Sequence, residues 1–188
     1  MKQENELSTL SLAILGLVSQ RPLTGYDIRK IFLTTPMGHV SNSPGAIYPA
    51  LTRIEEAGWI RGKIGQGETR RQRVIYQTTP RGLKTLKECL SRPVTREDVI
   101  WHMDDLMLRF AFMDPVVGRE RTLQFLRDFA SQIDAHAADL RRYLDGVRDL
   151  MPVCGRLAME SGIQSYEMSA QWARRAIVEL QQHAEERS

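Results

Sequence analysis

The chain has 188 residues, of which 42% are hydrophobic and 26% are charged, and its net charge is +3. These values are typical of soluble globular proteins, and they argue against a disordered chain or one built from membrane spans. Its two cysteines, Cys89 and Cys154, lie far apart without ligand spacing, which indicates reduced thiols and a cytoplasmic protein.

The charge is distributed unevenly along the chain. Residues 1–92 hold 14 Lys and Arg against 7 Asp and Glu, a net charge of +7, whereas residues 93–188 hold 12 against 16, a net charge of −4. A basic half joined to a different half is a recognised sign of nucleic-acid binding. Many solvated surfaces are modestly basic too, so the asymmetry alone does not decide between these two explanations.

The first two helices are marked by their ends. Apolar residues recur at helical spacing over residues 7–19, and Pro22 ends this first helix. Thr24 then provides an N-cap, and Asp27 three residues later completes the pattern of a capping box for a second helix. Residues 34–43 are rich in Thr, Pro, Gly and Ser, which predicts a loop.

A third helix is predicted to begin at Ser43 and Pro44, because a hydroxyl caps a helix and proline fits its first position. Gly58 is expected to end it. Pro49 removes an intrahelical hydrogen bond and predicts a bend or a tight initial turn. The inward face is expected to consist of Ile47, Ala50, Leu51 and Ile54.

A β-hairpin is predicted after the third helix. Residues 59–64 and 74–78 are rich in β-forming side chains, and the polar, basic residues 65–73 between them form the expected tip. A fourth helix is expected over residues 79–90, again opened by a Thr-Pro pair.

The second half is expected to be helical throughout. Thr95 is predicted to cap a helix that reaches Phe110, and residues 114–115 to begin a long helix. A proline and a glycine within residues 151–155 separate it from a last helix. The fold class is therefore mainly α with a small β-hairpin, and Pro93 marks the boundary between domain 1–92 and domain 93–188.

The two long helices carry apolar residues at alternating steps of three and four. This spacing is the seam of helices packed nearly parallel, and it predicts a homodimerisation surface. An intramolecular bundle is the alternative. The predicted dimerisation residues are Leu123, Leu126, Ile133, Leu140, Leu144, Tyr166, Ala170, Ala173, Ile177 and Leu180.

Two short helices, a capped third helix and a basic hairpin follow one another in the order of an N-terminal winged helix-turn-helix. The major groove of DNA is about 12 Å wide and admits one helix, whose outward side chains can read base edges. Arginines in a hairpin suit the phosphate backbone or a narrow minor groove. The predicted DNA-binding residues are Tyr26, Lys30, Ser43, Gly45, Tyr48, Thr52, Arg53, Lys63, Arg70, Arg71 and Arg73.

Each of these assignments has a structural alternative. Tyr26 and Tyr48 can pack against the domain instead of touching DNA. Arg53 can pair with Glu56, and the arginines of the hairpin can form an ordinary solvated loop.

The sequence resembles the PadR family of transcriptional regulators. The similarity lies in "LSLAILGLVSQRPLTGYDIRKIF", "SPGAIYPALTRIEEAGWI" and "YQTTPRG", and the proline within "YPAL" is typical of the third helix in that family. The segment "REDVIWHMDDLMLRFAFMD" and the helices after it are similar to the longer, virulence-activator-like members. The resemblance implies a homodimer with intertwined C-terminal helices that binds a partly palindromic operator in double-stranded DNA, and we expect a repressor.

No enzymatic chemistry is predicted. The sequence has no nucleophile elbow, phosphate-binding glycine loop or zincin motif, and its four histidines lack metal-ligand spacing, so we expect neither cofactor nor metal. Two other classes stay open: a protein-interaction module with an incidental basic wing, and an enzyme built on the aromatic residues near Trp101. The same region, with His102, Met103 and Phe110, could instead line a pocket for a small-molecule effector or simply be core.

Overall fold

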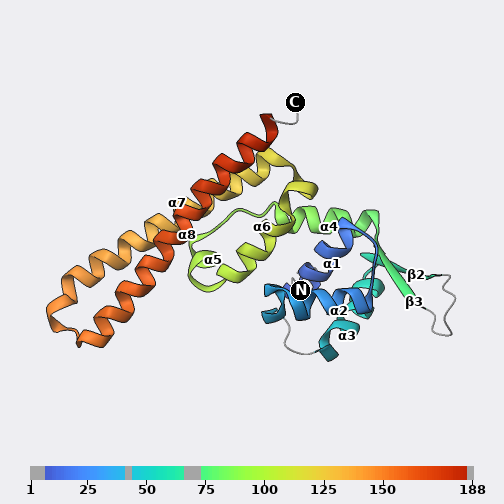
Figure 1. Cartoon of the computed structure of the whole chain (residues 1–188), viewed down its shortest axis with the longest axis horizontal. Helices are drawn as coiled ribbons and strands as arrows, with labels where there is room; N and C mark the ends of the chain where they lie inside the picture. Colours follow the sequence, from blue (N-terminus) through green and yellow to red (C-terminus); the bar gives the residue numbers. More distant parts are fainter. Residues whose placement is uncertain (1–6, 41–43, 66–72, 186–188) are drawn as a thin grey trace, which may run out of the picture. The chain divides into compact units, whose positions relative to one another are not determined.

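The computed structural model describes residues 7–40, 44–65 and 73–185. Their backbone forms two compact units (Figure 1). The first consists of the described residues up to 92 together with residues 111–117, and the second of residues 93–110 with the described residues from 118 onward.

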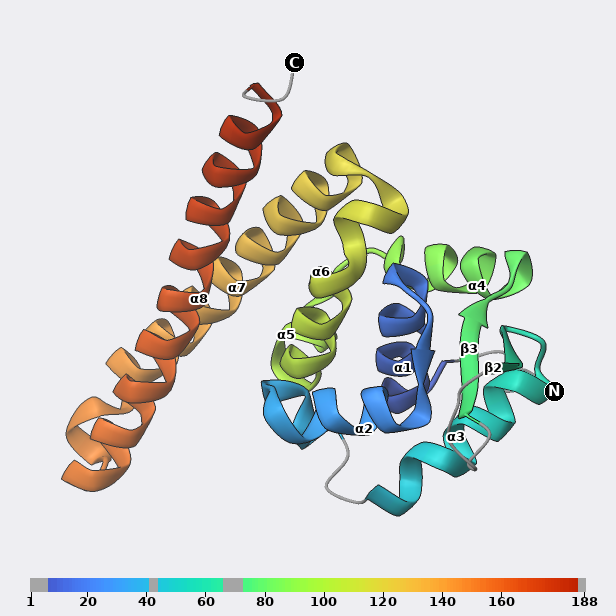
Figure 2. The ribbon, with the colours of Figure 1, turned by 45° about the vertical axis from the view of Figure 1, so that its right-hand side comes forward.

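Helix α1 (Thr9–Gln20) is the centre of the first unit. The Ser8 hydroxyl caps it by accepting a hydrogen bond from the N–H of Ser11 at 3.2 Å. The eight consecutive residues from 11 to 18 are buried, so α1 is covered on all sides. In Figure 2, α1 stands beside β3, and α2 and α3 cross below it.

Helix α2 (Gly25–Thr34) begins with the predicted capping box. The Thr24 hydroxyl accepts a hydrogen bond from the Asp27 N–H, and the Asp27 carboxylate accepts hydrogen bonds from both the N–H and the hydroxyl of Thr24. These bonds hold the pKa of the Asp27 carboxyl below its usual value. A short 3-10 helix, η1 (Pro36–His39), then occupies part of the segment predicted to be an irregular loop.

Helix α3 (Pro44–Glu56) begins at the predicted proline. Its buried residues are those predicted from the spacing: Ile47, Ala50, Leu51 and Ile54. The helix continues through Pro49, which is exposed, and the chain turns away at Gly58, where φ is +73°. The predicted cap, Ser43, lies outside the described residues.

The sheet contains one strand more than predicted. Strands β2 (Ile60–Gly65) and β3 (Arg73–Thr78) pair in antiparallel register, as the predicted hairpin. The two-residue strand β1 (Leu23–Thr24) pairs with the other edge of β3, which gives the strand order β1-β3-β2. Because β1 follows Pro22 directly and is so short, no periodic pattern indicates it.

Helix α4 (Pro80–Leu90) follows β3 after a single residue, Thr79. The Thr79 hydroxyl accepts a hydrogen bond from the Gly82 N–H at 3.0 Å and donates one to the Gly58 carbonyl at 2.6 Å. This one side chain therefore caps α4 and holds it against the turn between α3 and β2.

The predicted single helix from Thr95 to Phe110 is wrong. The structure has α5 (Arg96–Trp101), capped by Thr95, and a separate α6 (Met103–Val117). The break falls at His102, whose φ of −133° and ψ of 34° are not helical.

The predicted start of the long helix at residues 114–115 is also wrong, because Pro115 lies within the last turn of α6. The chain turns instead at Gly118, where φ is +84°, a conformation that glycine adopts at little cost. Residues 111–117 belong to the first unit, where the ring of Phe112 fills the space beside Gly16.

The second unit is dominated by two long helices. Helix α7 (Arg119–Val147), the short η2 (Arg148–Leu150) and α8 (Val153–Glu185) form a hairpin in which α7 and α8 lie side by side (Figures 1 and 2). Gly155, expected to break the chain, lies inside α8.

Aromatic packing and ion pairs hold this hairpin together. Trp172 of α8 makes edge-on contacts with the rings of Phe110 and Phe129, 5.2 and 6.1 Å between centroids. Arg141 pairs with Glu167 across the two helices, with 2.7 Å between Nε and Oε1. Such exposed pairs contribute only about 0–1 kcal/mol each, so the apolar and aromatic core accounts for most of the stability.

We predict that the second unit loses stability in mild acid because of His136. Its ring is buried, lies edge-on to Tyr166 with 4.8 Å between centroids, and its Nδ1 has no hydrogen-bond partner among the described residues. Burial, assisted by the charge of Arg96, lowers the pKa of His136 below its usual 6.5. The unfolded chain therefore binds more protons, and the free energy of unfolding falls as the pH drops below about 6.5.

Urea unfolding at pH 7.5 and 5.5 measures the effect, followed by Trp172 fluorescence in a background in which the two other tryptophans, Trp59 and Trp101, are changed to phenylalanine. The difference between the two pH values should shrink in His136→Phe and persist in His183→Gln, which changes an exposed histidine. An equal pH dependence in wild type and His136→Phe would contradict this role.

The described structure confirms a mainly helical fold with a small antiparallel sheet, an N-terminal winged helix-turn-helix and a C-terminal helical region. Among the described helices, none combines the length and apolar character needed to cross a membrane.

Candidate nucleic-acid interface

The outward face of α3 is polar and exposed. Because its apolar residues are buried against the first unit, the opposite side faces solvent and presents Gly45, Tyr48, Pro49, Thr52, Arg53 and Glu56. The Thr52 hydroxyl donates a hydrogen bond to the Tyr48 carbonyl at 3.2 Å, which leaves its oxygen free to accept another. This face can therefore donate and accept hydrogen bonds along one side of a helix that fits the major groove.

Tyr48 is both exposed and structurally supported. Its side chain is 52% exposed, yet its ring lies against the start of α2, where a Cβ on Gly25 would come within 2.8 Å of Tyr48 Cε1. The glycine of "TGYDI" thus makes room for the tyrosine of "GAIYPAL". The packing and DNA-contact interpretations of Tyr48 are compatible, because the supported ring leaves half of its surface in solvent.

The exposed face of α2 adds cations next to an aromatic ring. Tyr26 is 66% exposed, and Lys30 is exposed one turn further along the helix. Arg29 is exposed on the same side and was missed as a candidate. Its spacing of three residues from Tyr26 could have indicated it, because residues three and four apart share a helix face.

The hairpin β2–β3, called the wing from here on, has two different faces. Side chains of residues directly opposite each other share a face, and successive residues alternate between faces. The register, with Arg61 opposite Gln77 and Gly65 opposite Arg73, places three exposed cations on one face. The cations of this cationic face are Arg61, Lys63 and Arg73, and Ile75 and Gln77 lie between them on β3. Arg61 is one of the cations that the sequence places in the hairpin, together with Lys63 and Arg73.

The other face of the wing is apolar. Ile60, at its base, is buried, whereas the cross-strand pair Ile64 and Val74, toward the tip, is exposed, Ile64 by 65%. Arg70 and Arg71, predicted to contact DNA from the tip, lie outside the described residues.

The predicted dimerisation residues fall into two groups. Half of them are buried by the α7–α8 hairpin of the chain itself, and the other half are only partly covered. The buried ones are Leu126, Ile133, Leu144, Ala170 and Ala173, and the partly exposed ones are Leu123, Leu140, Tyr166, Ile177 and Leu180. Half of the three-four seam therefore packs within one chain.

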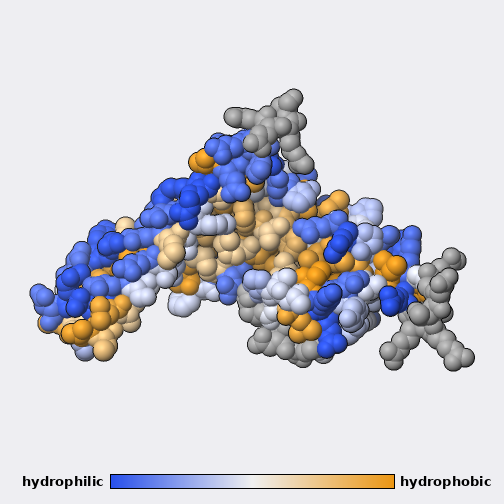
Figure 3. All heavy atoms as spheres, viewed as in Figure 1, coloured by the Kyte–Doolittle hydropathy of each residue, from blue (hydrophilic) through white to orange (hydrophobic). Residues whose placement is uncertain are grey.

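The hairpin also carries exposed apolar side chains that its seam does not explain. Tyr143, Leu150, Val153 and Leu157 are exposed at its turn, where Figure 3 shows a hydrophobic surface at the end of the α7–α8 pair. Leu157, Met168 and Val178 are also exposed along α8. Eleven residues bring Met168 back to nearly the side of Leu157, whereas ten residues place Val178 about 80° around the helix from Met168.

The aromatic residues near Trp101 do not gather into a site. Trp101 is 73% exposed, whereas Phe110 packs with Phe125 and Trp172 in the second unit. In the described part of the chain, no three His, Cys, Asp or Glu residues are grouped so that they could hold a metal ion.

Known proteins resemble this chain over both units. The sequence model of the transcriptional regulator PadR-like family matches residues 14–88, and that of the virulence activator alpha C-terminal region matches residues 104–181. The negative transcriptional regulator PadR of Bacillus subtilis (strain 168) is 26% identical over 135 residues, 72% of each chain.

Two solved structures of Bacillus subtilis PadR are also similar. The complex with operator DNA shares 21% identity at a TM-score of 0.45, covering 93% of this chain and 99% of that one. The complex with p-coumaric acid shares 20% identity at a TM-score of 0.40, covering 95% of this chain and 98% of that one. The two family matches together cover most of the chain, which therefore belongs to the transcriptional regulator PadR-like family and carries a C-terminal region of the virulence activator alpha type.

Proposed function

We propose that the protein is a homodimeric regulator that binds a palindromic operator, with α3 in the major groove and the wing on the flanking backbone. The observation that carries the proposal is the exposed polar face of α3, followed within the same unit by a wing whose one face is cationic. Two independent surfaces of one small unit are thus both suited to DNA.

Base recognition is assigned to α3. Arg53 can donate two hydrogen bonds to guanine, and Thr52 can meet a thymine methyl or donate to a phosphate. Tyr48, held in place by its packing on Gly25, can donate its hydroxyl hydrogen bond with little loss of conformational freedom. Gly45, in the first turn of α3, would lie where free N–H groups favour phosphate, and we assign Ser43 a phosphate contact as well.

Backbone contacts are assigned to the wing and to α2. The predicted cations Lys63, Arg70, Arg71 and Arg73, together with Arg61, would neutralise phosphates from the wing. Tyr26 and Lys30 would contact the backbone from α2. Neutralised phosphates release counterions, so the affinity should fall steeply with salt.

Dimerisation is assigned to the second unit. Since half of the seam is buried within the chain, the surface available to a second copy consists of the partly exposed seam residues and the exposed Leu157, Met168 and Val178 of α8. Exposed apolar side chains of this kind are stabilised when a partner covers them. A twofold dimer would place two recognition helices about 34 Å apart, one turn of DNA.

Repression and ligand control are carried over from relatives. The Bacillus subtilis relative is named a negative regulator, and one solved PadR structure holds p-coumaric acid. We therefore propose that this protein represses transcription in the cytoplasm and responds to a small-molecule effector whose chemistry the sequence does not identify. Such an effector would act by binding the DNA-bound and free arrangements unequally.

Selection from a random duplex library tests the proposed function and identifies the operator in the same experiment. The expected result is an inverted repeat whose half-sites are about 10 base pairs apart, and a dimer of the 21.5 kDa chain in sedimentation equilibrium. A monomer would contradict the twofold arrangement. Failure to enrich any sequence, together with salt-insensitive binding of another protein, would favour the interaction-module alternative.

A further inference from the structure

A hydrogen bond joins the recognition helix to the wing. The Glu55 carboxylate of α3 accepts it from the Gly62 N–H of β2, with 2.6 Å between nitrogen and oxygen. Strand β2 is the edge of the sheet, so some of its N–H groups lack a strand partner, and Glu55 takes the one at Gly62. A short hydrogen bond to a carboxylate is stronger than one between neutral groups.

The packing at Gly62 is close enough to exclude a side chain. A Cβ there would lie 2.7 Å from Val74 Cγ1 and 2.9 Å from Glu55 Oε1. The absence of a side chain at residue 62 thus lets the carboxylate reach the strand. Gly62 does not have a positive φ, so its role is the space it leaves and not its backbone conformation.

The strand β2 of the wing is therefore bonded to α3 at two places along its length. At its base, the Gly58 N–H donates to the Glu55 carbonyl at 2.8 Å and the Trp59 N–H donates to the Ile54 carbonyl at 2.9 Å. On the β3 side, pairing with β1 at Tyr76 and Ile75 holds the hairpin higher up. The bond at Gly62, which lies opposite Tyr76, attaches the edge strand β2 to α3 at that same height.

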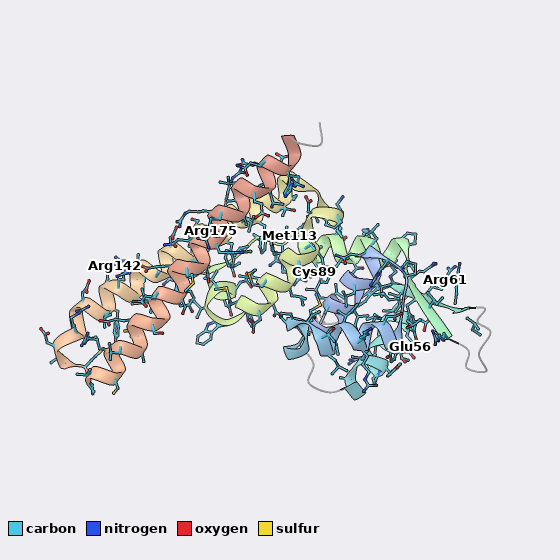
Figure 4. The ribbon with its side chains drawn as sticks, viewed as in Figure 1. Glu56, Arg61, Cys89, Met113, Arg142 and Arg175 are labelled. Carbon is cyan, nitrogen blue, oxygen red and sulfur yellow. The ribbon has the colours of Figure 1, made fainter. Side chains whose placement is uncertain are left out.

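The charge of Glu55 is also directed at the sheet. Burial, and then the negative charge of Glu55, raise the pKa of the Tyr76 hydroxyl, which lies opposite Gly62 on β3. The neighbouring residue Glu56 belongs to the exposed outward face of α3 (Figure 4). Two adjacent glutamates therefore have different surroundings.

We infer that Glu55 is a positioning residue, which fixes the wing relative to α3 so that major-groove and backbone contacts are made together. The inference rests on the proposed DNA binding. Without the bond, β2 would be held at this height only through its pairing with β3. Its remaining motion relative to α3 would have to be restricted when DNA binds, and that restriction lowers affinity.

The pair Glu55→Ala and Glu88→Ala separates positioning from charge. Glu88 is exposed on α4, away from the outward face of α3, and each variant removes one negative charge from the first unit. Loss of repulsion alone should leave affinity for the selected operator unchanged or higher. We expect Glu88→Ala to behave in that way, and Glu55→Ala to bind about tenfold more weakly in spite of its lost negative charge. Glu55→Gln, which keeps an acceptor oxygen, should recover most of the affinity.

Two further readouts separate this role from general destabilisation. The slope of log affinity against log salt should be smaller by about 0.9 for each phosphate contact that the displaced wing of Glu55→Ala loses. In the free protein, the Gly62 amide proton resonance should move upfield in Glu55→Ala and stay in place in Glu88→Ala. Gly62→Ala should reproduce the DNA-binding defect from the strand side.

The outcomes distinguish this inference from the proposed function. Wild-type protein that binds no DNA would contradict the proposed function, while the Gly62 resonance would still report the bond. Wild-type protein that binds tightly, with Glu55→Ala and Glu88→Ala equal in affinity and salt slope, would overturn the inference alone. An unchanged Gly62 resonance in Glu55→Ala would overturn it as well.

Discussion

Replacing Gly82 by alanine should unfold or strongly destabilise the first unit. A Cβ at this position would lie 1.9 Å from the Trp59 carbonyl oxygen and 2.7 Å from its carbonyl carbon, both backbone atoms that no rotamer change can move aside. The same junction holds the cap of α4, since Thr79 bonds to Gly82 and to the carbonyls of Gly58 and Trp59. Overpacking of this kind costs about 1–3 kcal/mol, and occasionally more.

Thermal unfolding followed by circular dichroism measures this effect. A loss of about 3 kcal/mol would lower the Tm of a unit of this size by more than 10 °C. The control is Gly162→Ala in α8, where an added Cβ has nothing within 4 Å and alanine favours the helix by about 1 kcal/mol. Equal stability of Gly82→Ala and wild type would show that the junction can relax, contrary to this account.

Removing the three cations of the wing should nearly abolish operator binding. The variant with Arg61, Lys63 and Arg73 changed to alanine loses three phosphate partners per chain and six per dimer. A protein with 6–10 phosphate contacts loses about 10³–10⁵ in affinity when salt rises from 50 to 200 mM. We therefore expect a decrease of at least about 100-fold near physiological salt, with little change in stability because all three side chains are exposed.

A control for net charge accompanies the wing variant. Arg127 and Arg175 are exposed arginines of the second unit (Arg175 is labelled in Figure 4), and changing both to alanine also makes the protein less positive. This double variant should retain operator binding within about threefold. A comparable loss of operator affinity in both variants would mean that binding depends on the net charge of the protein and not on the cationic face.

The parts of the fold that the sequence predicts well are those with local chemical signals. Thr24 with Asp27 and Thr79 with Pro80 mark helix starts, because the groups that satisfy the first N–H groups lie within three residues. Gly58 marks the end of α3 for the same local reason. These signals need no information about the rest of the chain.

The errors arise where tertiary packing overrides local pattern. Nothing local separates α5 from α6 at His102, and Pro115 is a stronger helix-start signal than Gly118, although the chain turns at Gly118. The cause lies in the first unit, which takes residues 111–117 and thereby extends α6 past the proline. Strand β1 depends likewise on a partner some 50 residues away.

The candidate site divides in the same way. Helical spacing predicts which side of α3 faces outward, since burial of Ile47 and Ile54 requires it. The contact between Gly25 and Tyr48 and the bond from Gly62 to Glu55 join residues far apart in sequence, and no periodicity reveals them. For the second unit, the three-four seam does not distinguish packing within a chain from packing between two chains, because both bury the same pattern.

The most direct test of the central claim is a fluorescence anisotropy titration of the selected operator with wild-type protein over a salt series from 50 to about 200 mM. Binding through α3 and the wing predicts an affinity that falls steeply and linearly on logarithmic axes, and an unrelated duplex bound at least about 10³-fold more weakly. Affinity that is independent of salt, or equal for both duplexes, would contradict the claim that this protein reads DNA through those two surfaces.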